Sequence, residues 1–475
     1  MTSKDFRIEH DFLGEKAIPS QHYWGVHTAR ALENFPITGA PIAIMPELIR
    51  ALALVKKSAA KANASMRVLD KERSDAIVSA CDELLAGHYH REFVVDVIQG
   101  GAGTSTNMNA NEVIANIALE KLGHEKGRYD VLHPNDHVNA SQSTNDVYPT
   151  AVRLALWQDL GNLQQSLQSL QTAFAQKSTE FKSILKIART QLQDAVPMTL
   201  GQEFSTYAVM LEEDLARLQE ARALITEINL GATAIGTGIN APAGYAELVC
   251  QILAQESGAP LLKASNLVEA TQDTGAFVQL SGVLKRIATK LSKTCHDLRL
   301  LSSGPQAGFA DIKLPARQAG SSIMPGKVNP VIPEVVNQVA YEVIGNDVTI
   351  TMASEAGQLQ LNAFEPIIAW SLFKSIAHLS RACDTLCQHC VLGIEANVTV
   401  LDKRVRESVT LVTALNPYIG YEQAARIAKL AIASGRPIDE VAAQLGILSK
   451  EGLHQLLVPE KLTQPQMTQP NKMGA

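Results

Sequence analysis

The sequence predicts a mainly helical protein with a central bundle of five long helices between smaller N-terminal and C-terminal domains. Three observations support this fold class. Apolar residues recur at helical spacing over long stretches of the chain. Ala and Leu are frequent while aromatic residues make up only 5%, which favours helix interfaces of small and aliphatic side chains. Polar segments rich in Gly, Ser, Thr and Asn separate the helical stretches.

The clearest helical pattern covers residues 277–301, where apolar residues recur at steps of three and four. It is sustained for roughly seven turns. Similar patterns cover residues 150–180, 200–230, 333–352 and 366–395. Five long helices are typical of a bundle. Helices of this length usually bury two faces, so we expect the bundle to pack against other subunits.

The N-terminal part predicts shorter elements. The first 40 residues are punctuated by Gly and Pro, which favours short strands or extended arms. Pro46 fits the first turn of a helix through Val55. Further helices are expected at 76–85 and, after a Gly-rich turn, at 108–122. These elements form a predicted N-terminal domain of residues 1–142.

Beyond residue 396 the helical patterns shorten, to about 399–412, 420–433, 438–445 and 450–456. The predicted central long-helix domain therefore spans residues 143–396. A small C-terminal helical domain follows at 397–475. Its tail, residues 464–471, lacks apolar periodicity, and we expect it to be disordered.

Composition excludes several classes of protein. Hydrophobic residues make up 46% and charged residues 19% of the 475 positions, enough for a sizeable core. The net charge of -6, without a basic stripe, argues against nucleic-acid binding. No apolar stretch is long enough for a membrane span, and the N-terminus has no signal-peptide pattern. Six cysteines are best explained as reduced thiols, so we expect a cytoplasmic protein.

Three polar segments, residues 100–107, 141–146 and 320–330, interrupt the helical sequence. Hydroxyls, amides and backbone N–H groups at helix starts bind carboxylates well. Each segment alone is explained by a cap and a turn, but three in one chain favour a site. The third carries Lys327 after two flexible glycines, Gly320 and Gly326, so it could close over a small anion. Val328 after this lysine excludes a Walker A phosphate loop.

The third segment reads Gly-Ser-Ser-Ile-Met-Pro-Gly-Lys-Val-Asn-Pro and resembles the signature loop of the aspartase/fumarase superfamily. Residues 101–105, 141–146 and 231–238 also resemble family segments, and the resemblance runs from about residue 6 to about residue 460. Residues 23–28, 141–146, 192–200 and 329–338 are similar to the aspartase branch in particular. The resemblance implies an aspartase/fumarase-like fold.

The resemblance also implies an activity, the reversible deamination of L-aspartate to fumarate and ammonia. A base removes a Cβ proton, and the charge spreads into the β-carboxylate as an aci-carboxylate, which preorganised donors stabilise. Ser321 aligns with the general base and needs activation by its surroundings. The implied substrate-binding residues are Thr104, Ser143, Thr144 and Ser322 at the β-carboxylate, Lys327 and Asn329 at the α-carboxylate, and Asn145, Thr190 and Gln191 nearby.

Gln191 bears on the leaving group. Many superfamily members have His at this position. Loss of water benefits from an acid that protonates the leaving oxygen, whereas ammonia leaves from an ammonium group that already carries its proton. A non-ionisable Gln therefore suits ammonia. The resemblance further implies no metal and no organic cofactor, with a divalent cation such as Mg²⁺ only as an activator. It also implies a homotetramer whose active sites are shared between subunits.

Two other functions remain open at this point. One is a class II fumarase or another fumarate-forming lyase of the superfamily. The other is a non-catalytic helical oligomer with the same fold. The intact Ser321, Lys327 and Asn329 argue against the second.

Three further motifs have simpler structural explanations. Cys383, Cys387 and Cys390 share one helix face, which indicates buried small side chains rather than a zinc site. Residues 433–435 read Ala-Ser-Gly, the tripeptide that aromatic amino acid ammonia-lyases convert into their prosthetic group. Here a glycine that ends a helix explains the tripeptide. Residues 133–137 resemble a secondary dicarboxylate-contact region of fumarases, and a turn rich in capping residues is the alternative.

Overall fold

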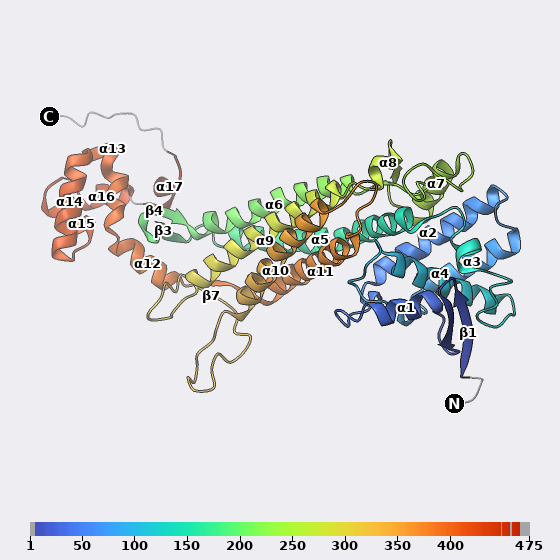
Figure 1. Ribbon diagram of the computed structural model, residues 1–475. Coiled ribbons are helices and arrows are strands. Elements are labelled where there is room, and N and C mark those ends of the chain that lie inside the picture. The colour runs from blue at the N-terminus through green and yellow to red at the C-terminus, as the bar shows by residue number, and fades with distance from the viewer. Residues whose placement is uncertain (1–4, 448, 457, 466–475) are drawn as a thin grey trace. The chain divides into compact units, whose positions relative to one another are not determined.

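The computed structural model describes residues 5–447, 449–456 and 458–465, and most of them are helical (Figure 1). The N-terminal helices are α1 (Val26–Asn34), α2 (Pro46–Ser65), α3 (Lys71–Leu85) and α4 (Thr104–Lys121). The C-terminal helices are α12 (Val398–Glu407), α13 (Asn416–Ile419), α14 (Tyr421–Ser434), α15 (Ile438–Gln444), α16 (Lys450–Leu456) and α17 (Pro459–Leu462). Between them, two shorter helices, α7 (Tyr245–Ser257) and α8 (Leu267–Ala270), accompany the long ones.

The five long helices that the sequence predicts are all present, and Figure 1 shows them side by side. They are α5 (Thr144–Glu180), α6 (Leu200–Leu224), α9 (Gly275–Leu301), α10 (Val331–Glu355) and α11 (Glu365–His389). In the part of the chain that the structure describes, these are the helices of 25 or more residues. The fold is therefore mainly α, as predicted.

Several predicted helix ends were wrong, because strand pairings end two of the long helices. The helix expected to reach residue 230 ends at Leu224, where β5 (Glu227–Ile228) pairs in parallel with β6 (Leu262–Lys263). The helix expected to reach residue 395 ends at His389, before β8 (Glu395–Ala396) pairs with β7 (Ile312–Lys313). In both cases the pairing partner is distant in sequence, so helical periodicity alone cannot reveal it.

The chain divides into two compact units, each assembled from separate stretches. The first contains residues 1–165, 216–288 and 340–380, and the second contains residues 166–215, 289–339 and 381–475. Each long helix contributes one portion to each unit. Both units therefore contain helix–helix packing of the predicted bundle.

In the first unit, polar contacts join the long helices at their buried faces. Asp347 of α10 accepts hydrogen bonds from Ser281 Oγ and Lys285 Nζ of α9, at 2.7 and 2.6 Å. Asn346 of α10 donates to Ser375 Oγ of α11 at 3.0 Å. Because all of these groups except the exposed Lys285 are buried, the bonds fix the register of the three helices as well as their packing.

In the second unit, aromatic rings of α5 and α6 pack together. The centroids of Phe174 and Tyr207 lie 5.4 Å apart, and Phe204 lies between Phe181 and Tyr207. A separate apolar cluster holds the C-terminal helices together, and Leu415, Ile427 and Ala442 are its fully buried members. Such clusters supply most of the stabilisation of helix packing.

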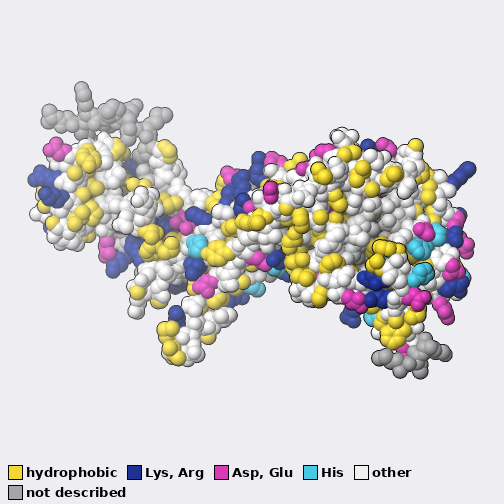
Figure 2. All heavy atoms as spheres, in the orientation of Figure 1, with side chains coloured by type: hydrophobic (Ala, Val, Ile, Leu, Met, Phe, Trp, Pro, Cys, Tyr) yellow, Lys and Arg dark blue, Asp and Glu magenta, His cyan; other side chains and the backbone are white. Residues whose placement is uncertain are grey.

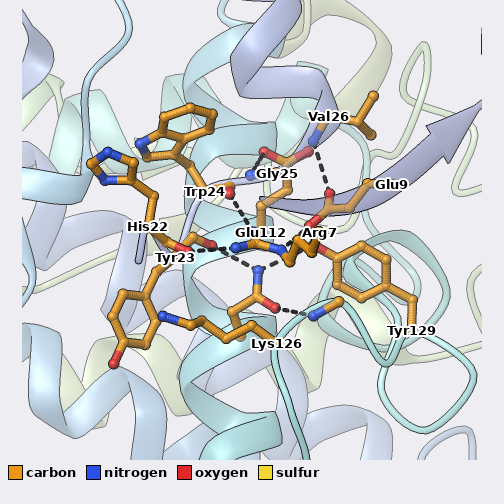
Figure 3. A network of polar contacts seen from close by, with 12 residues as sticks. Arg7, Glu9, His22, Tyr23, Trp24, Gly25, Val26, Glu112, Lys126 and Tyr129 are labelled. Carbon is orange, nitrogen blue, oxygen red and sulfur yellow. Dashed lines mark hydrogen bonds and ion pairs between the residues drawn. The ribbon is translucent and has the colours of Figure 1, made fainter. Parts of the chain in front are cut away.

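The N-terminal arm is an antiparallel hairpin, in line with the expected short strands. Strands β1 (Phe6–Asp11) and β2 (Gly14–Pro19) pair with Phe6 opposite Pro19. A buried polar network attaches this arm to α4 (Figure 3). Glu112 of α4 accepts hydrogen bonds from the backbone N–H groups of Gly25, His27 and Thr28 at 2.7–3.2 Å. It therefore caps the start of α1, where the N-cap residue Gly25 has no side chain to do so.

Three smaller predictions can be assessed. The cysteines at 383, 387 and 390 are buried, as expected of small apolar side chains. Gly435 has a φ of +66° and ends α14, so residues 433–435 are a helix stop. Residues 466–475 of the tail lie outside the described residues. None of the described helices is long and apolar enough to cross a membrane.

Candidate active site

The start of α5 presents three predicted substrate-binding residues together: Ser143, Thr144 and Asn145. Ser143 precedes the helix, and its Oγ accepts the N–H of Asn145 at 3.3 Å. Thr144 is the first helical residue, and both it and Ser143 are partly exposed. A helix N-terminus with flanking hydroxyls is suited to bind a carboxylate.

Asp146 holds this segment in place through its buried carboxylate. This residue was not singled out from the sequence. Its carboxylate accepts the N–H groups of Ser143, Gly231 and Thr233 at 2.9–3.0 Å. It thereby ties residues 143–146 to the Gly-rich segment 231–238. Burial raises the pKa of Asp146 to about 6. The spacing of Ser143 and Asp146 matches a capping box, and this was the signal available in the sequence.

Thr104 is the first residue of α4, which begins four residues earlier than the sequence predicted. Gly103, with a φ of +90°, makes the turn that lets the helix start there. The Thr104 hydroxyl donates to the carbonyl of Gly101 at 2.7 Å. One turn later, Asn107 donates from Nδ2 to Thr144 Oγ1 at 3.0 Å. The structure therefore joins the starts of α4 and α5, as a shared carboxylate site requires.

Thr190 and Gln191 lie in a hairpin that the sequence did not predict. Strands β3 (Leu185–Thr190) and β4 (Gln193–Thr199) pair with Thr190 opposite Gln193. The two turn residues, Gln191 and Leu192, have φ values of +53° and +63°. Two positive φ values match a type I′ turn, which non-glycine residues adopt at a cost. The turn exposes Thr190 and Gln191.

A buried ion cluster anchors the hairpin. Asp311, whose side chain is 1% exposed, lies 2.8 Å from Arg189 and 3.2 Å from Lys186, both of β3. Arg404 of α12 also contacts Asp311. Lys186 has a second partner in Glu203 at 2.6 Å. Asp311 thus holds three cations from two elements next to the turn that carries Thr190.

The signature loop, residues 320–330, is tied at its base. Gly320 donates to the carbonyl of Lys327 at 2.7 Å, and Asn329 Nδ2 donates to the carbonyl of Gly320 at 3.1 Å. A Cβ on Gly320 would lie 2.5 Å from the Lys327 carbonyl oxygen, so only glycine fits there. Ser322 and Lys327 are exposed, whereas Ser321 and Asn329 are partly buried.

Lys327 and Asn329 line one cavity of about 580 Å³, together with Arg299 and Glu334. Arg299 and Glu334 form an ion pair at 3.8 Å. Ser321 Oγ accepts the N–H of Ile323 at 3.2 Å, so a backbone donor already supports negative charge on this oxygen.

The predicted site residues therefore form two groups. Those of the first unit are Thr104, Ser143, Thr144 and Asn145. Those of the second unit are Thr190, Gln191, Ser321, Ser322, Lys327 and Asn329. The first group offers hydroxyls and helix starts, and the second offers a cation, amides and the candidate base.

The segment at residues 133–137 has a local structural role. His133 Nδ1 accepts the N–H groups of Asn135 and Asp136, at 3.1 and 3.3 Å, as a capping residue does. His133 and Asn135 also line a cavity of about 430 Å³. Among the residues described, no group of three or more His, Cys, Asp or Glu side chains could hold a metal ion.

Comparisons with known proteins identify the family of the chain. Residues 14–345 match a family model described as lyase, and residues 411–464 match one described as the fumarase C C-terminus. Aspartate ammonia-lyase from Pseudomonas fluorescens is 58% identical over 98% of both chains. That of Escherichia coli is 50% identical over 98% of this chain and 97% of its own.

Two solved structures extend the comparison. A fumarate lyase:delta crystallin from Brucella melitensis, bound to cobalt, is 57% identical, with a TM-score of 0.95 over 97% of this chain and 100% of that one. A class II fumarase from Schistosoma mansoni is 35% identical, with a TM-score of 0.91 over 98% of this chain and 100% of that one.

The fold and these matches define a mainly helical lyase with the fumarate lyase fold, which confirms the predicted fold class. Within that class, the chain belongs to the aspartate ammonia-lyase family. The predicted enzyme class, a carbon–nitrogen lyase, is confirmed with it.

Proposed function

We propose that this chain converts L-aspartate reversibly into fumarate and ammonia. The observation that carries the proposal is the 50–58% identity, over nearly the whole chain, to aspartate ammonia-lyases of several bacteria. The paired hydroxyl-bearing helix starts and the lysine-bearing loop provide the two carboxylate sites that such a substrate needs.

In the proposed reaction, Ser321 Oγ removes a proton from Cβ. The electron pair moves into the β-carboxylate, giving the aci-carboxylate, and then forms the C=C bond as the C–N bond breaks. The ammonium nitrogen takes the electron pair of the C–N bond and leaves as ammonia, so it needs no added proton. Ser321 requires activation, because a hydroxyl is a weak base. The Ile323 N–H on its oxygen and the charge of Lys327 support that activation.

The β-carboxylate is assigned to the starts of α4 and α5, with Thr104, Ser143 and Thr144 as donors and Ser322 completing the site. Charge grows on this group in the transition state, so fixed donors there lower the barrier. Removing one such donor typically lowers kcat by about 10²–10³. Lys327 and Asn329 are assigned to the α-carboxylate.

Asn145, Thr190 and Gln191 are assigned to the region of the amino group. The side-chain nitrogen of Asn145 is bound to the Ala234 carbonyl at 2.8 Å, which leaves its oxygen to accept from an ammonium group. Gln191 has no ionisable group, which suits a leaving group that needs no acid. The scheme requires no metal or organic cofactor, and Mg²⁺ enters only as an activator.

We also propose a homotetramer whose active sites are shared between subunits. An exposed apolar stripe on α10 supports an oligomer: Tyr341, Val348 and Met352 share one face and are 54–67% exposed. Figure 2 shows further hydrophobic side chains on the surface of the long helices. Sharing would also explain why the site residues of one chain fall into two groups, since each group could meet its counterpart from another subunit.

Two further parts of the proposal concern location and domains. A cytoplasmic enzyme fits the free cysteines and the absence of a membrane-spanning helix among the residues described. The domain boundaries at residues 142 and 396 remain part of the proposal. They would assign Thr104 to the N-terminal domain and the other site residues to the central one.

The test is to offer the purified protein L-aspartate or L-malate and to follow fumarate absorbance. We expect fumarate from aspartate. Ser321→Ala should assemble normally and lose at least about 10³-fold in kcat, as expected for loss of the base. Ser205→Ala, which alters a partly exposed serine of α6, is the matched control and should retain full activity.

The same assay separates the rival functions. Malate is included as a substrate because the chain is 35% identical to a class II fumarase. Fumarate from malate but not from aspartate would establish the fumarase instead. No turnover of either compound, with Ser321→Ala indistinguishable from the unmodified protein, would favour a non-catalytic oligomer.

A further inference from the structure

Lys56, in the middle of α2, is a fully buried lysine that the proposed reaction does not use. Its Nζ donates to Asn139 Oδ1 at 2.7 Å and to Gln142 Oε1 at 3.0 Å. Among the residues described, it has no carboxylate in ion-pair contact. A buried cation without a direct counter-charge is costly, so its retention points to a role beyond packing.

The orientations of both amides are fixed by their other contacts. Gln142 Nε2 donates to the carbonyls of Val138 and Ala140, each at 3.0 Å. Asn139 Nδ2 donates to the carbonyl of Gln142 at 3.3 Å. With the nitrogens committed to carbonyls, both amide oxygens face Lys56. Lys56 therefore holds the turn that leads directly into Ser143 and the start of α5.

The network continues to the candidate site. Asn139 Oδ1 also accepts from Asn107 Nδ2 at 3.2 Å, and the same nitrogen donates to Thr144 Oγ1 at 3.0 Å. Since Thr144 Oγ1 accepts this bond, its own proton is directed elsewhere. Among the residues described, none accepts that proton, so the hydroxyl is set to donate to a ligand.

We propose that Lys56 is a positioning residue for the reaction, which through Asn139 and Asn107 sets the Thr144 hydroxyl as a donor to the β-carboxylate. The inference rests on the proposed function, because it uses the role assigned to Thr144. Lys56 itself does not touch the substrate. It fixes the one turn and the one amide on which the orientation of that hydroxyl depends.

The positive charge of Lys56 also favours a carboxylate at the start of α5. Burial lowers its pKa to about 7, while Asp146 acts to raise it. The titratable groups that face Lys56 are the carboxyl group of Asp146 and the thiol of Cys81, and burial raises the pKa of that thiol so that it stays neutral. A substrate carboxylate bound at the start of α5 would favour the protonated form of Lys56, so binding and protonation support each other.

The kinetic signature follows from where charge develops. Thr144 is assigned to the carboxylate that gains charge in the transition state, so a misplaced hydroxyl weakens the transition state more than the ground state. Lys56→Met, which keeps the length and removes the donor, should lower kcat by about 10- to 100-fold with a smaller change in KM. Lys56→Gln restores one donor and should recover part of that loss.

Lys57→Met is the matched control. Lys57 is the next residue of α2, and it pairs with Asp82 at 2.9 Å and Glu256 at 3.0 Å, away from the network. The same change there should leave kcat and KM within about twofold, because neither Asp82 nor Glu256 belongs to the network that reaches Thr144. If Lys57→Met lowers kcat as much as Lys56→Met, the loss reflects a weakened α2 and the inference is overturned.

A double-mutant cycle tests the route through Thr144. Thr144→Ala alone should lower kcat by about 10²-fold or more. If Lys56 acts through Thr144, adding Lys56→Met to Thr144→Ala should lower kcat by less than about threefold further. Full additivity of the two losses would overturn the inference.

Failure of this inference differs from failure of the proposed function. An unmodified protein that does not deaminate aspartate overturns both, because Thr144 then has no assigned carboxylate. An active protein whose Lys56→Met variant retains its kcat overturns the role of Lys56 alone.

Discussion

Asp311→Asn offers the sharpest test of how the hairpin of residues 185–199 is held. The substitution keeps the shape of the side chain and removes the one carboxylate, among the residues described, that contacts Lys186, Arg189 and Arg404 together. Lys186 keeps Glu203 as a partner at 2.6 Å, whereas Arg189 has no other carboxylate partner among the described residues. The backbone bonds of Asp311, to Leu301 and Asn397, are unaffected.

The expected magnitude follows from burial. Removing one partner of a buried ion pair costs about 3–5 kcal/mol. The Asp311 side chain is 1% exposed and that of Arg189 is 15% exposed, so this range applies, and the acceptor that asparagine retains favours its lower end. A loss of about 3 kcal/mol makes local opening of the hairpin more than about a hundredfold more frequent.

Hydrogen–deuterium exchange, followed peptide by peptide at fixed protein concentration, measures that opening directly. Residues 185–199 should lose protection in the Asp311→Asn variant, and kcat/KM for aspartate should fall at least about tenfold as Thr190 and Gln191 lose their position. Asp402→Asn is the matched control, because its pair with Arg406 is largely exposed and contributes about 0.5 kcal/mol or less.

Two results would refute the reasoning. If the hairpin of Asp311→Asn exchanges as slowly as that of the unmodified protein, the ion cluster does not hold it. If Asp402→Asn and Asp311→Asn lower protection and activity equally, the effect comes from the net charge and not from the buried pairing.

Three further predictions concern the loop, the leaving group and pH. Gly320→Ala should lower kcat/KM by about 100-fold with little change in thermal stability, because its Cβ collides with Lys327 in an exposed loop; an active variant would contradict this. Gln191→His should not confer malate turnover above about 1% of the aspartate rate, because one side chain does not set the leaving group by itself. Malate turnover above that level would contradict this prediction. The free energy of unfolding should rise from pH 7 to 10.5, by at most about 1.4 kcal/mol per pH unit, because only the unfolded chain keeps Lys56 protonated there. In Lys56→Met, the increase of the free energy of unfolding with pH should be smaller. An unchanged pH dependence, measured by chemical denaturation, would refute this prediction.

Helical periodicity located the long helices well because each buries a continuous stripe of its own side chains. The pattern from Phe277 to Leu301 coincides with the end of α9 and begins two residues after its start. Periodicity failed where a partner distant in sequence decides the structure. The strands β5 and β8 both depend on pairings that no local pattern encodes.

The candidate site shows the same division. Ser321, Lys327 and Asn329 were available from the sequence because a dense local motif carries them. Asp311 was not, because its importance comes from three cations contributed by β3 and α12. Lys56 was equally inconspicuous, as one lysine of an amphipathic helix. Only burial distinguishes it from its neighbour Lys57.

The sequence alone therefore determined the helical fold class, the family and the proposed substrate-binding residues, since these depend on local periodicity and contiguous motifs. The tertiary structure alone decided how those residues are held. Asp146, Asp311 and Lys56 act through contacts between segments distant in the chain, and the energy of a buried charge depends on what the fold places around it. The sequence gives the identity of each such residue but not its surroundings.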